Sequence, residues 1–254
     1  MDDVELIDLL ERTADAVGAV LTAHEDFDLV AGSDQQHHSD LVADEAALAV
    51  LEPSGVRILS EESAITDGGA NAAITVVVDP LDGSTNAKHR LPWYGVSLCA
   101  VDADGPRASL VRRLAGPDGP TWRAVRGGGA TRDGAPIRSG TCRTMDDAIL
   151  ASAGPLPDGL RWRQFRVLGA AALDLCCVAD GNLDGWVDGS DGHRPWDYLG
   201  ALLVCTEAGA FVDELDGLDL VVLDHDVRRR PVAAATDVLG VAMRDGIRRS
   251  TRSH

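Results

Sequence analysis

Two helical patterns of hydrophobic positions open the chain. Apolar side chains recur every three or four positions over residues 3–22, which predicts an amphipathic helix. A second helix is expected over residues 40–51, with Asp40 at its N-cap. The polar stretch between them contains His37 and His38 and is expected to be a solvated loop, because no further ligand stands at useful spacing for a metal.

A series of strands is expected to follow these helices. Residues 56–59 predict a short strand, and the β-branched run 74–78 predicts a buried one that Pro80 and Gly83 would end. Further strands are expected between Asp-Gly and Gly-Pro turn signals, at residues 94–101, 109–114 and 121–125.

Strands and helices alternate in the second half of the chain. The small apolar stretch 169–179 predicts a buried helix, and an apolar helix is expected from Trp196 to a stop at Gly209. A final helix is expected to run from Thr236 or Asp237 to about Arg249. Short strands are expected at residues 149–151, 185–188, 211–212, 220–223 and 232–235.

Composition and charge exclude some functions and leave others open. The chain has 254 residues, of which 45% are hydrophobic, so it can bury a sizeable core. Its net charge of −18 argues against a broad nucleic-acid-binding surface, which needs a basic face. A small anionic substrate remains compatible with this charge, because a bound cation can invert the local field.

The location and domain organisation follow from weaker signals. The five cysteines show no C-x-x-C spacing and lie mostly in apolar surroundings, which is typical of reduced, buried thiols. The acidic amino terminus does not resemble a signal peptide, and no apolar run approaches the roughly 20 residues of a membrane span. We therefore expect a cytoplasmic protein without a membrane partner. We also expect one domain over residues 1–254, with halves of about 1–140 and 141–254.

Acidic side chains occupy the ends of several expected elements. Asp79 and Asp82 follow a strand, Glu61 follows another, and Asp197 stands in the first turn of a helix. Each has a purely structural alternative, as a turn former, a surface charge or a partner of the helix dipole. If the four converge, their repulsion would be relieved by divalent cations. Ligands that offer only oxygen favour Mg²⁺, Mn²⁺ or Ca²⁺ over zinc.

Three motifs in the chain resemble signatures of one family. The segment Asp79-Pro80-Leu81-Asp82-Gly83-Ser84-Thr85-Asn86 resembles the D-P-[IL]-D-G-[ST]-x-N signature of the inositol monophosphatase family. The segments Trp196–Ala201 and Glu207–Ala210 resemble its second signature, and Ser60–Ser63 resembles its acidic element. Because order and spacing agree over nearly the whole chain, the combined resemblance is specific.

The resemblance implies a fold, an activity and metal ligands. The fold would be an α/β (α+β) layered α-β-α-β-α sandwich that forms a homodimer and hydrolyses a small phosphate monoester with Mg²⁺. Two ions would activate a water molecule, Mn²⁺ would substitute for Mg²⁺, and lithium would inhibit. One ion would be held by Glu61, Asp79 and the Leu81 carbonyl, and the second by Asp79, Asp82 and Asp197.

The resemblance also implies roles in substrate binding and catalysis. Ser84 would orient the attacking water, with Glu61 and Asp82 in the catalytic set. The substrate would lie against backbone amides at the start of a helix, against a segment of small residues, and against acids that bind hydroxyl groups. These residues are Gly83, Ser84, Thr85, Gly169, Ala170, Ala171, Asp188 and Asp197.

Two departures from the family pattern stand out. Ala87 replaces the usual aromatic residue after the motif asparagine. The family's T-x-x-D element, which serves a third metal and catalysis, is blurred, and Asp40 and Asp44 both match its acid. We favour Asp40, because it leaves Asp44 where the family often has a glutamate.

The substrate is not fixed by these motifs. An inositol monophosphate or a sugar phosphate is expected first. The same scaffold serves fructose-1,6-bisphosphatases, histidinol-phosphatases and 3′(2′),5′-bisphosphate nucleotidases, and a non-catalytic binding or regulatory protein is a further alternative. A second phosphate would need a basic pocket, for which Lys88, Arg90 and Arg194 are the candidates.

Overall fold

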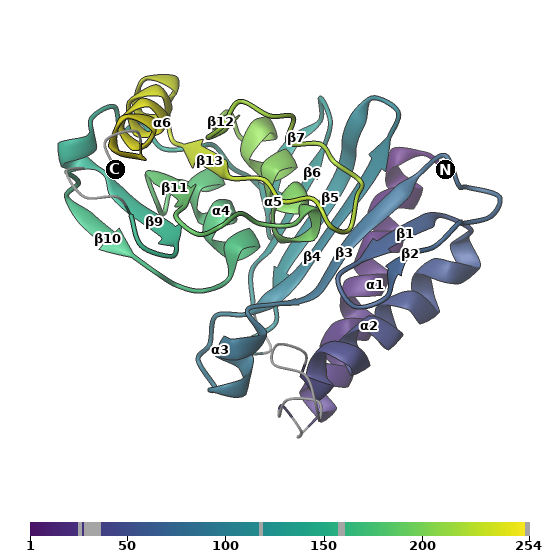
Figure 1. The fold of residues 1–254 in the computed structure, drawn as a ribbon. Coiled ribbons are helices and arrows are strands. Elements are labelled where there is room, and N and C mark those ends of the chain that lie inside the picture. The colour runs from purple at the N-terminus through teal and green to yellow at the C-terminus, as the bar shows by residue number, and fades with distance from the viewer. Residues whose placement is uncertain (25–26, 28–36, 117–118, 157–160, 252–254) are drawn as a thin grey trace.

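Two β-sheets with helices around and between them make up the computed structural model, which describes residues 1–24, 27, 37–116, 119–156 and 161–251 (Figure 1). Within these residues the larger sheet has eight strands in the order β2-β1-β3-β4-β5-β6-β7-β8, and the smaller has five in the order β10-β9-β11-β13-β12.

The strands of the larger sheet are β1 (Arg57–Ser60), β2 (Ala64–Ile65), β3 (Thr75–Asp82), β4 (Gly95–Asp102), β5 (Gly105–Arg113), β6 (Thr121–Val125), β7 (Gly129–Arg132) and β8 (Ala135–Pro136). Those of the smaller sheet are β9 (Ile149–Ala153), β10 (Gln164–Arg166), β11 (Gly185–Asp188), β12 (Phe211–Glu214) and β13 (Pro231–Ala234). The helices are α1 (Asp3–Ala23), α2 (His38–Leu51), α3 (Ser84–Lys88), α4 (Ala171–Ala179), α5 (Pro195–Glu207) and α6 (Asp237–Thr251), with 3-10 turns at Glu52–Ser54 and Met145–Asp147.

Alternating side chains of the strands build three cores and thereby five layers. On β3, Val76 and Val78 pack with α1 and α2, whereas Val77 faces α4 and α5 between the two sheets. On the smaller sheet, Val187 and Val232 pack under α6. The period of two along each strand therefore produces the layer order α-β-α-β-α, and the predicted fold is confirmed (Figure 1).

Helix α5 lies close to the larger sheet because its middle residue is glycine. A Cβ atom on Gly200 would lie 2.7 Å from the Ser97 hydroxyl oxygen and 3.2 Å from the Leu98 carbonyl oxygen of β4. Such contacts are too short for a side chain. The close packing fixes the start of α5 relative to the end of β3, which is where the candidate site lies.

Several predicted elements differ in extent. Helix α2 begins at His38, and Asp40 is its third residue rather than its N-cap. His37 is buried rather than solvated, with Nδ1 3.0 Å from the Phe27 carbonyl oxygen, while residues 32–36 of the expected loop lie outside the described residues. The strand predicted at residues 220–223 is absent from the structure, which describes this segment as irregular.

The end of β3 also differs from the prediction. The strand does not stop before Pro80 but continues to Asp82, through an irregularity in its pairing with β4 between Asp79 and Asp82. Proline lacks the N–H needed for a regular ladder, so it is accommodated at this break.

No described helix is both long and apolar enough to cross a bilayer. All five cysteines are free thiols, and four of them are buried.

Candidate active site

The ends of two neighbouring strands bring the first three acidic residues together. Strands β1 and β3 run parallel with Ser60 opposite Val78, and the Glu61 N–H donates to the Val78 carbonyl oxygen at 3.2 Å. Glu61 therefore follows β1 beside the point at which β3 reaches Asp79 and Asp82. Asp79 and Asp82 are buried, whereas Glu61 is exposed.

Asp82 connects the end of β3 to the start of α4. Its two carboxylate oxygens accept hydrogen bonds from the backbone N–H groups of Ala171 at 3.0 Å and Ala172 at 2.9 Å. The N-cap residue of α4, Ala170, has no side chain that can accept these bonds. Asp82 thus caps the helix from a distant part of the chain, where its negative charge also matches the helix dipole.

Asp197 contributes the fourth carboxylate from the first turn of α5. One of its oxygens accepts a hydrogen bond from the backbone N–H of Arg194 at 2.8 Å, which caps that helix. The structural role predicted as an alternative for Asp197 is therefore present, and it leaves the other oxygen available to the site.

The electrostatics of the four carboxylates show that they face one another. Burial and then repulsion from Asp197 raise the pKa of Asp82 to about 7, although hydrogen bonds from the helix N–H groups lower it. Burial and then repulsion from Glu61, Asp82 and Asp197 raise the pKa of Asp79. Desolvation by the surrounding protein and repulsion from Asp197 also raise the pKa of Glu61, although this residue has access to solvent. Such a cluster is stabilised by a cation.

The donor set fits Mg²⁺. All donors are oxygens, which suits a hard divalent ion. Among the described residues, no three Asp, Glu, His or Cys side chains are grouped so that they alone could hold a metal ion. Mg²⁺ usually keeps several waters and takes only one or two carboxylates, so a closed protein cage is not required.

The turn after β3 presents backbone N–H groups. Gly83 has a φ of +85° and stands directly before α3, and a Cβ atom there would lie 3.0 Å from the Trp93 carbonyl oxygen and 3.1 Å from the Ala170 Cβ. Only glycine therefore fits the turn and its contact with Ala170. The N–H groups of Ser84 and Thr85 lie in the first turn of α3 and have no acceptor within the helix.

The two candidates for the T-x-x-D acid have different surroundings. Asp44 accepts hydrogen bonds from the hydroxyls of Ser60, at 2.5 Å, and of Ser63, so both of its oxygens are used. Asp40 accepts one from the His37 N–H at 2.8 Å, and its other oxygen is buried without a partner. Burial, together with repulsion from Glu62 and against the hydrogen bond from His37, raises the pKa of Asp40 to about 7. The choice of Asp40 stays a prediction, which this free oxygen favours.

A cavity of about 390 Å³ opens beside Asp82 and Asp197. Its wall includes the small-residue segment predicted to admit the substrate, together with groups that were not predicted. The lining residues are Asp82, Ala153, Gly154, Val167, Gly169, Ala170, Ala171, Asp174, Ser190, Gly192, His193, Asp197 and Arg228.

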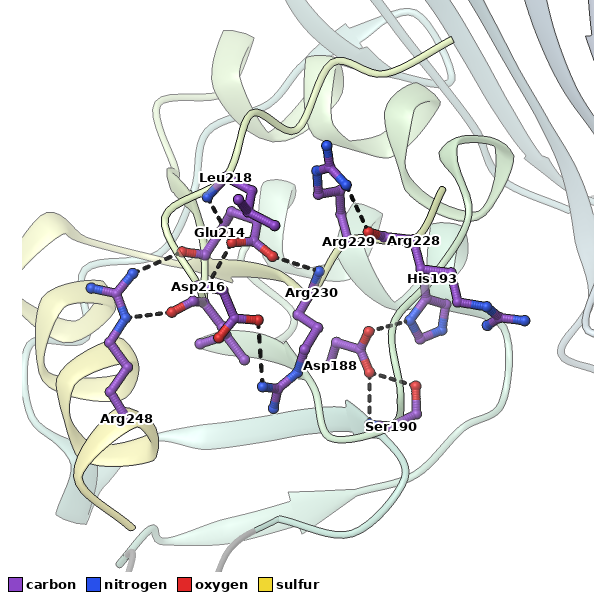
Figure 2. A network of polar contacts seen from close by, with 11 residues as sticks. Asp188, Ser190, His193, Glu214, Asp216, Leu218, Arg228, Arg229, Arg230 and Arg248 are labelled. Atoms are coloured by element: carbon purple, nitrogen blue, oxygen red, sulfur yellow. Dashed lines mark hydrogen bonds and ion pairs between the residues drawn. The ribbon is translucent and has the colours of Figure 1, made fainter. Parts of the chain in front are cut away.

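Asp188 is fully buried and engaged with its neighbours. One oxygen accepts hydrogen bonds from the Ser190 N–H at 2.7 Å and hydroxyl at 2.6 Å, and the other lies 2.7 Å from His193 Nδ1 (Figure 2). Its predicted contact with substrate hydroxyls stays a prediction. Its partners Ser190 and His193 line the cavity.

Three charged or titratable groups of the cavity wall, Asp174, His193 and Arg228, were not predicted from the sequence. Asp174 stands in the small apolar stretch of α4 and accepts a hydrogen bond from Trp93 Nε1 at 2.7 Å, and burial raises its pKa to about 8. An acid within an otherwise apolar helix was the available signal. His193 and Arg228 lie in loops whose local pattern carries no such signal.

The three basic residues proposed for a second phosphate do not line this cavity. Lys88 and Arg90 line a separate cavity with Leu21 and Tyr94. Arg194 donates a hydrogen bond to the His225 carbonyl oxygen and lies over the Trp196 ring. Arg228 is the arginine that the cavity beside Asp197 contains.

Comparison with known proteins extends this picture. A model of the inositol monophosphatase family matches residues 2–244. The fructose-1,6-bisphosphatase/inositol-1-monophosphatase of Methanothermobacter thermautotrophicus is 34% identical over 206 residues, which are 70% of this chain and 72% of the relative. Nus factor SuhB of Escherichia coli is 30% identical over 233 residues, with coverage of 84% and 86%.

Solved structures agree with the sequence comparison. An inositol monophosphatase from Anabaena superposes with a TM-score of 0.77 at 25% identity, covering 98% of this chain and 96% of that one. The Thermotoga maritima IMPase gives a TM-score of 0.84 at 20% identity, with coverage of 98% and 99%, and shows the same fold. The chain therefore belongs to the inositol monophosphatase family and is a phosphatase that acts on phosphate monoesters.

Proposed function

We propose that this chain hydrolyses a small phosphate monoester, of the inositol monophosphate or sugar phosphate kind, with Mg²⁺ as its cofactor. The observation that carries the proposal is the convergence of Glu61, Asp79, Asp82 and Asp197, in which desolvation and then mutual repulsion raise the pKa values of Glu61 and Asp79. Asp79 and Asp82 are buried, and the charges of His193 and Arg228 offset the repulsion at Asp197 only in part. Four carboxylates that repel one another in this way need cations to be ionised together.

The residues present would hold two ions. Glu61, Asp79 and the Leu81 carbonyl would hold one, and Asp79, Asp82 and Asp197 the other, with Mn²⁺ as a substitute. The free oxygen of Asp40 is the candidate for a third. When bound, these ions supply positive charge that acidifies the attacking water and neutralises the phosphate oxygens and the leaving alkoxide.

The protein itself positions the reactants. The first-turn N–H groups after Gly83 bind phosphate oxygens, because they have no acceptor within α3. The Ser84 hydroxyl accepts a hydrogen bond from the water and orients it. The segment Gly169-Ala170-Ala171 leaves room for the alcohol, since it lines the cavity with side chains no larger than a methyl group. Positioning and charge stabilisation carry such reactions, so no nucleophilic side chain is needed.

A substrate panel tests the proposal. Phosphate release would be measured with Mg²⁺ and with excess chelator for inositol 1-phosphate, fructose 1,6-bisphosphate, histidinol phosphate and 3′-phosphoadenosine 5′-phosphate. We expect release from at least one ester, reduced at least about a hundredfold by the chelator. Release from no member, or equal release with the chelator, would overturn the proposal.

Bisphosphatase activity is a second candidate, because the Methanothermobacter relative carries both activities in its name. The same panel separates it from the monophosphatase. The homodimer, the cytoplasmic location and inhibition by lithium are proposals that follow from family membership. Substitution of Asp82 or Asp197 should weaken lithium inhibition if these residues hold the second ion.

A further inference from the structure

Two basic side chains share the cavity wall with the carboxylates. His193 and Arg228 line the cavity that also contains Asp82, Asp174 and Asp197. Within the described residues Arg228 makes no ion pair at short distance, but its charge acts on Asp197 and lowers the pKa of that carboxyl against the effect of burial. The Arg228 Nη1 donates to the Gly192 carbonyl oxygen at 2.6 Å, and a guanidinium retains further donors after one such bond.

The backbone holds these two side chains next to each other. The His193 N–H donates to the Arg229 carbonyl oxygen at 2.7 Å, and the Arg229 N–H donates to the His193 carbonyl oxygen at 2.8 Å. This bridge fixes the segment before β13 against the loop before α5. Arg228, the residue adjacent to the bridge, is thereby placed beside His193 at the cavity.

The two arginines that follow Arg228 are engaged elsewhere. Arg229 Nε donates to the Asp219 carbonyl oxygen at 2.6 Å, and Arg230 Nη1 lies 3.7 Å from an Asp216 carboxylate oxygen. The Arg229 Nη1 also donates to the backbone carbonyl oxygen of Arg228 at 2.9 Å (Figure 2). Of the run Arg228-Arg229-Arg230, only Arg228 lines this cavity among the described residues.

The pair Asp188 and His193 changes the chemistry of the wall. The family resemblance assigns Asp188 to substrate hydroxyls, which a carboxylate binds as an acceptor. Here both of its oxygens are engaged by Ser190 and His193, and the imidazole lines the cavity instead. The edge-on contact between the rings of Trp186 and His193, with centroids 5.5 Å apart, further orients the imidazole.

We propose that Arg228 and His193 form a subsite for an anionic substituent on the alcohol part of the substrate. The inference rests on the proposed function and names its substrate class: phosphate monoesters whose alcohol carries a carboxylate or a second phosphate. A guanidinium at a cavity wall that retains free N–H donors binds either anion with charge-assisted hydrogen bonds, which a neutral polyol cannot match. His193 is a positioning residue whose orientation Asp188 fixes.

Matched substrate pairs test this subsite. 3-Phosphoglycerate carries a carboxylate where glycerol 1-phosphate carries a hydroxymethyl group, and fructose 1,6-bisphosphate carries a second phosphate that fructose 1-phosphate lacks. We expect kcat/KM to be about tenfold higher for the anionic member of at least one pair, mainly through KM, as one charge-assisted hydrogen bond provides. The pair with the larger ratio identifies the preferred anion.

Variants assign the preference to residues. Arg228→Gln should reduce the ratio of kcat/KM between the two members of that pair to about one. His193→Gln should reduce this ratio to a smaller extent, by raising KM for the anionic member. Arg229→Gln is the matched control, since its side chain is engaged outside the cavity, and should keep the wild-type ratio. Arg228 is exposed, so its replacement should not impair folding, which a thermal melt verifies.

Two outcomes would count against the subsite. If the wild type hydrolyses inositol 1-phosphate but prefers neither anionic member, or if Arg228→Gln keeps the preference, the inference is overturned and the proposed function stands. If the wild type releases phosphate from no monoester with Mg²⁺, the proposed function fails and the inference fails with it.

Discussion

The Asp82 carboxylate accepts a hydrogen bond from the backbone N–H of Ala171 at 3.0 Å and thereby joins the acidic end of β3 to the start of α4. A residue expected to bind a cation therefore also terminates a helix whose own N-cap is alanine. This double role places the small-residue wall of the cavity beside the acidic cluster. The geometry of the alcohol pocket consequently depends on the same side chain that would hold the second ion.

Replacing a member of the acidic cluster should stabilise the metal-free protein. Burial and repulsion raise the pKa of Asp79, which means that its ionised form is unfavourable in the fold. Asp79→Asn should therefore raise the free energy of unfolding in chelator at pH 8 by roughly 1–2 kcal/mol. Thermal melts of both proteins check this, and a lower melting temperature for the variant would contradict it.

Mg²⁺ should bind more tightly as the pH rises. The pKa of Asp82 is raised to about 7, so most Asp82 is protonated at pH 6 and ionised at pH 8. Since the ion displaces that proton, its affinity should increase about tenfold over this range. Calorimetric titration with Mg²⁺ at pH 6 and pH 8 measures this change in affinity. Without Mg²⁺, stability should fall as the pH rises from about 4 to about 7, because the folded state holds the proton longer.

The contact of Gly83 with Ala170 predicts a specific steric effect. Gly83→Ala combines a φ of +85° with Cβ contacts of 3.0 and 3.1 Å, so it should cost about 2–3 kcal/mol of stability and most of the activity. Gly134→Ala is the control, because Gly134 has a φ of +79° and no atom within 4 Å of its Cβ position. It should cost only about 1 kcal/mol. Equal losses in the two variants would argue against the contact.

The Asp188–His193 pair predicts a pH dependence of stability. Burial lowers the pKa of His193, but the hydrogen bond to Asp188 and the charges of Asp197, Asp188 and Asp82 outweigh it, so the net shift is upward. The folded state therefore favours the protonated imidazole. This contribution is fully present below about pH 6.5 and is lost as the pH rises through the raised value. The difference in melting temperature between wild type and His193→Gln should accordingly shrink from pH 6 to pH 9.

A control for this dependence is available on the surface. His89 is exposed after α3, and His89→Gln should show no such change with pH. If the His193→Gln difference is constant over the same range, the pair does not stabilise the protein through a charged imidazole.

The sequence allowed the acidic cluster to be predicted because its members follow local rules. Glu61, Asp79 and Asp82 end strands, and Asp197 begins a helix, so each position is readable within its own segment. The layers were also predictable, because the alternation of Val76, Val77 and Val78 assigns two faces to one strand.

The cationic wall could not be predicted in the same way. Arg228 reaches the cavity through the backbone bridge between His193 and Arg229, which joins loops that are far apart in the chain. The strand expected at residues 220–223 was wrong, since that apolar run is an irregular segment of the loop leading to Arg228. The engagement of Asp188 by His193 likewise depends on how a loop folds, and residue spacing did not indicate it.

The direct test of the acidic cluster is the rate of phosphate release with saturating substrate and Mg²⁺ for three proteins. These are the wild type, Asp79→Asn and the exposed control Asp104→Asn. Asp79→Asn should lower kcat at least about a hundredfold while it remains folded, and Asp104→Asn should match the wild type. Unchanged kcat in folded Asp79→Asn would contradict the assignment of this carboxylate to the ions on which hydrolysis depends.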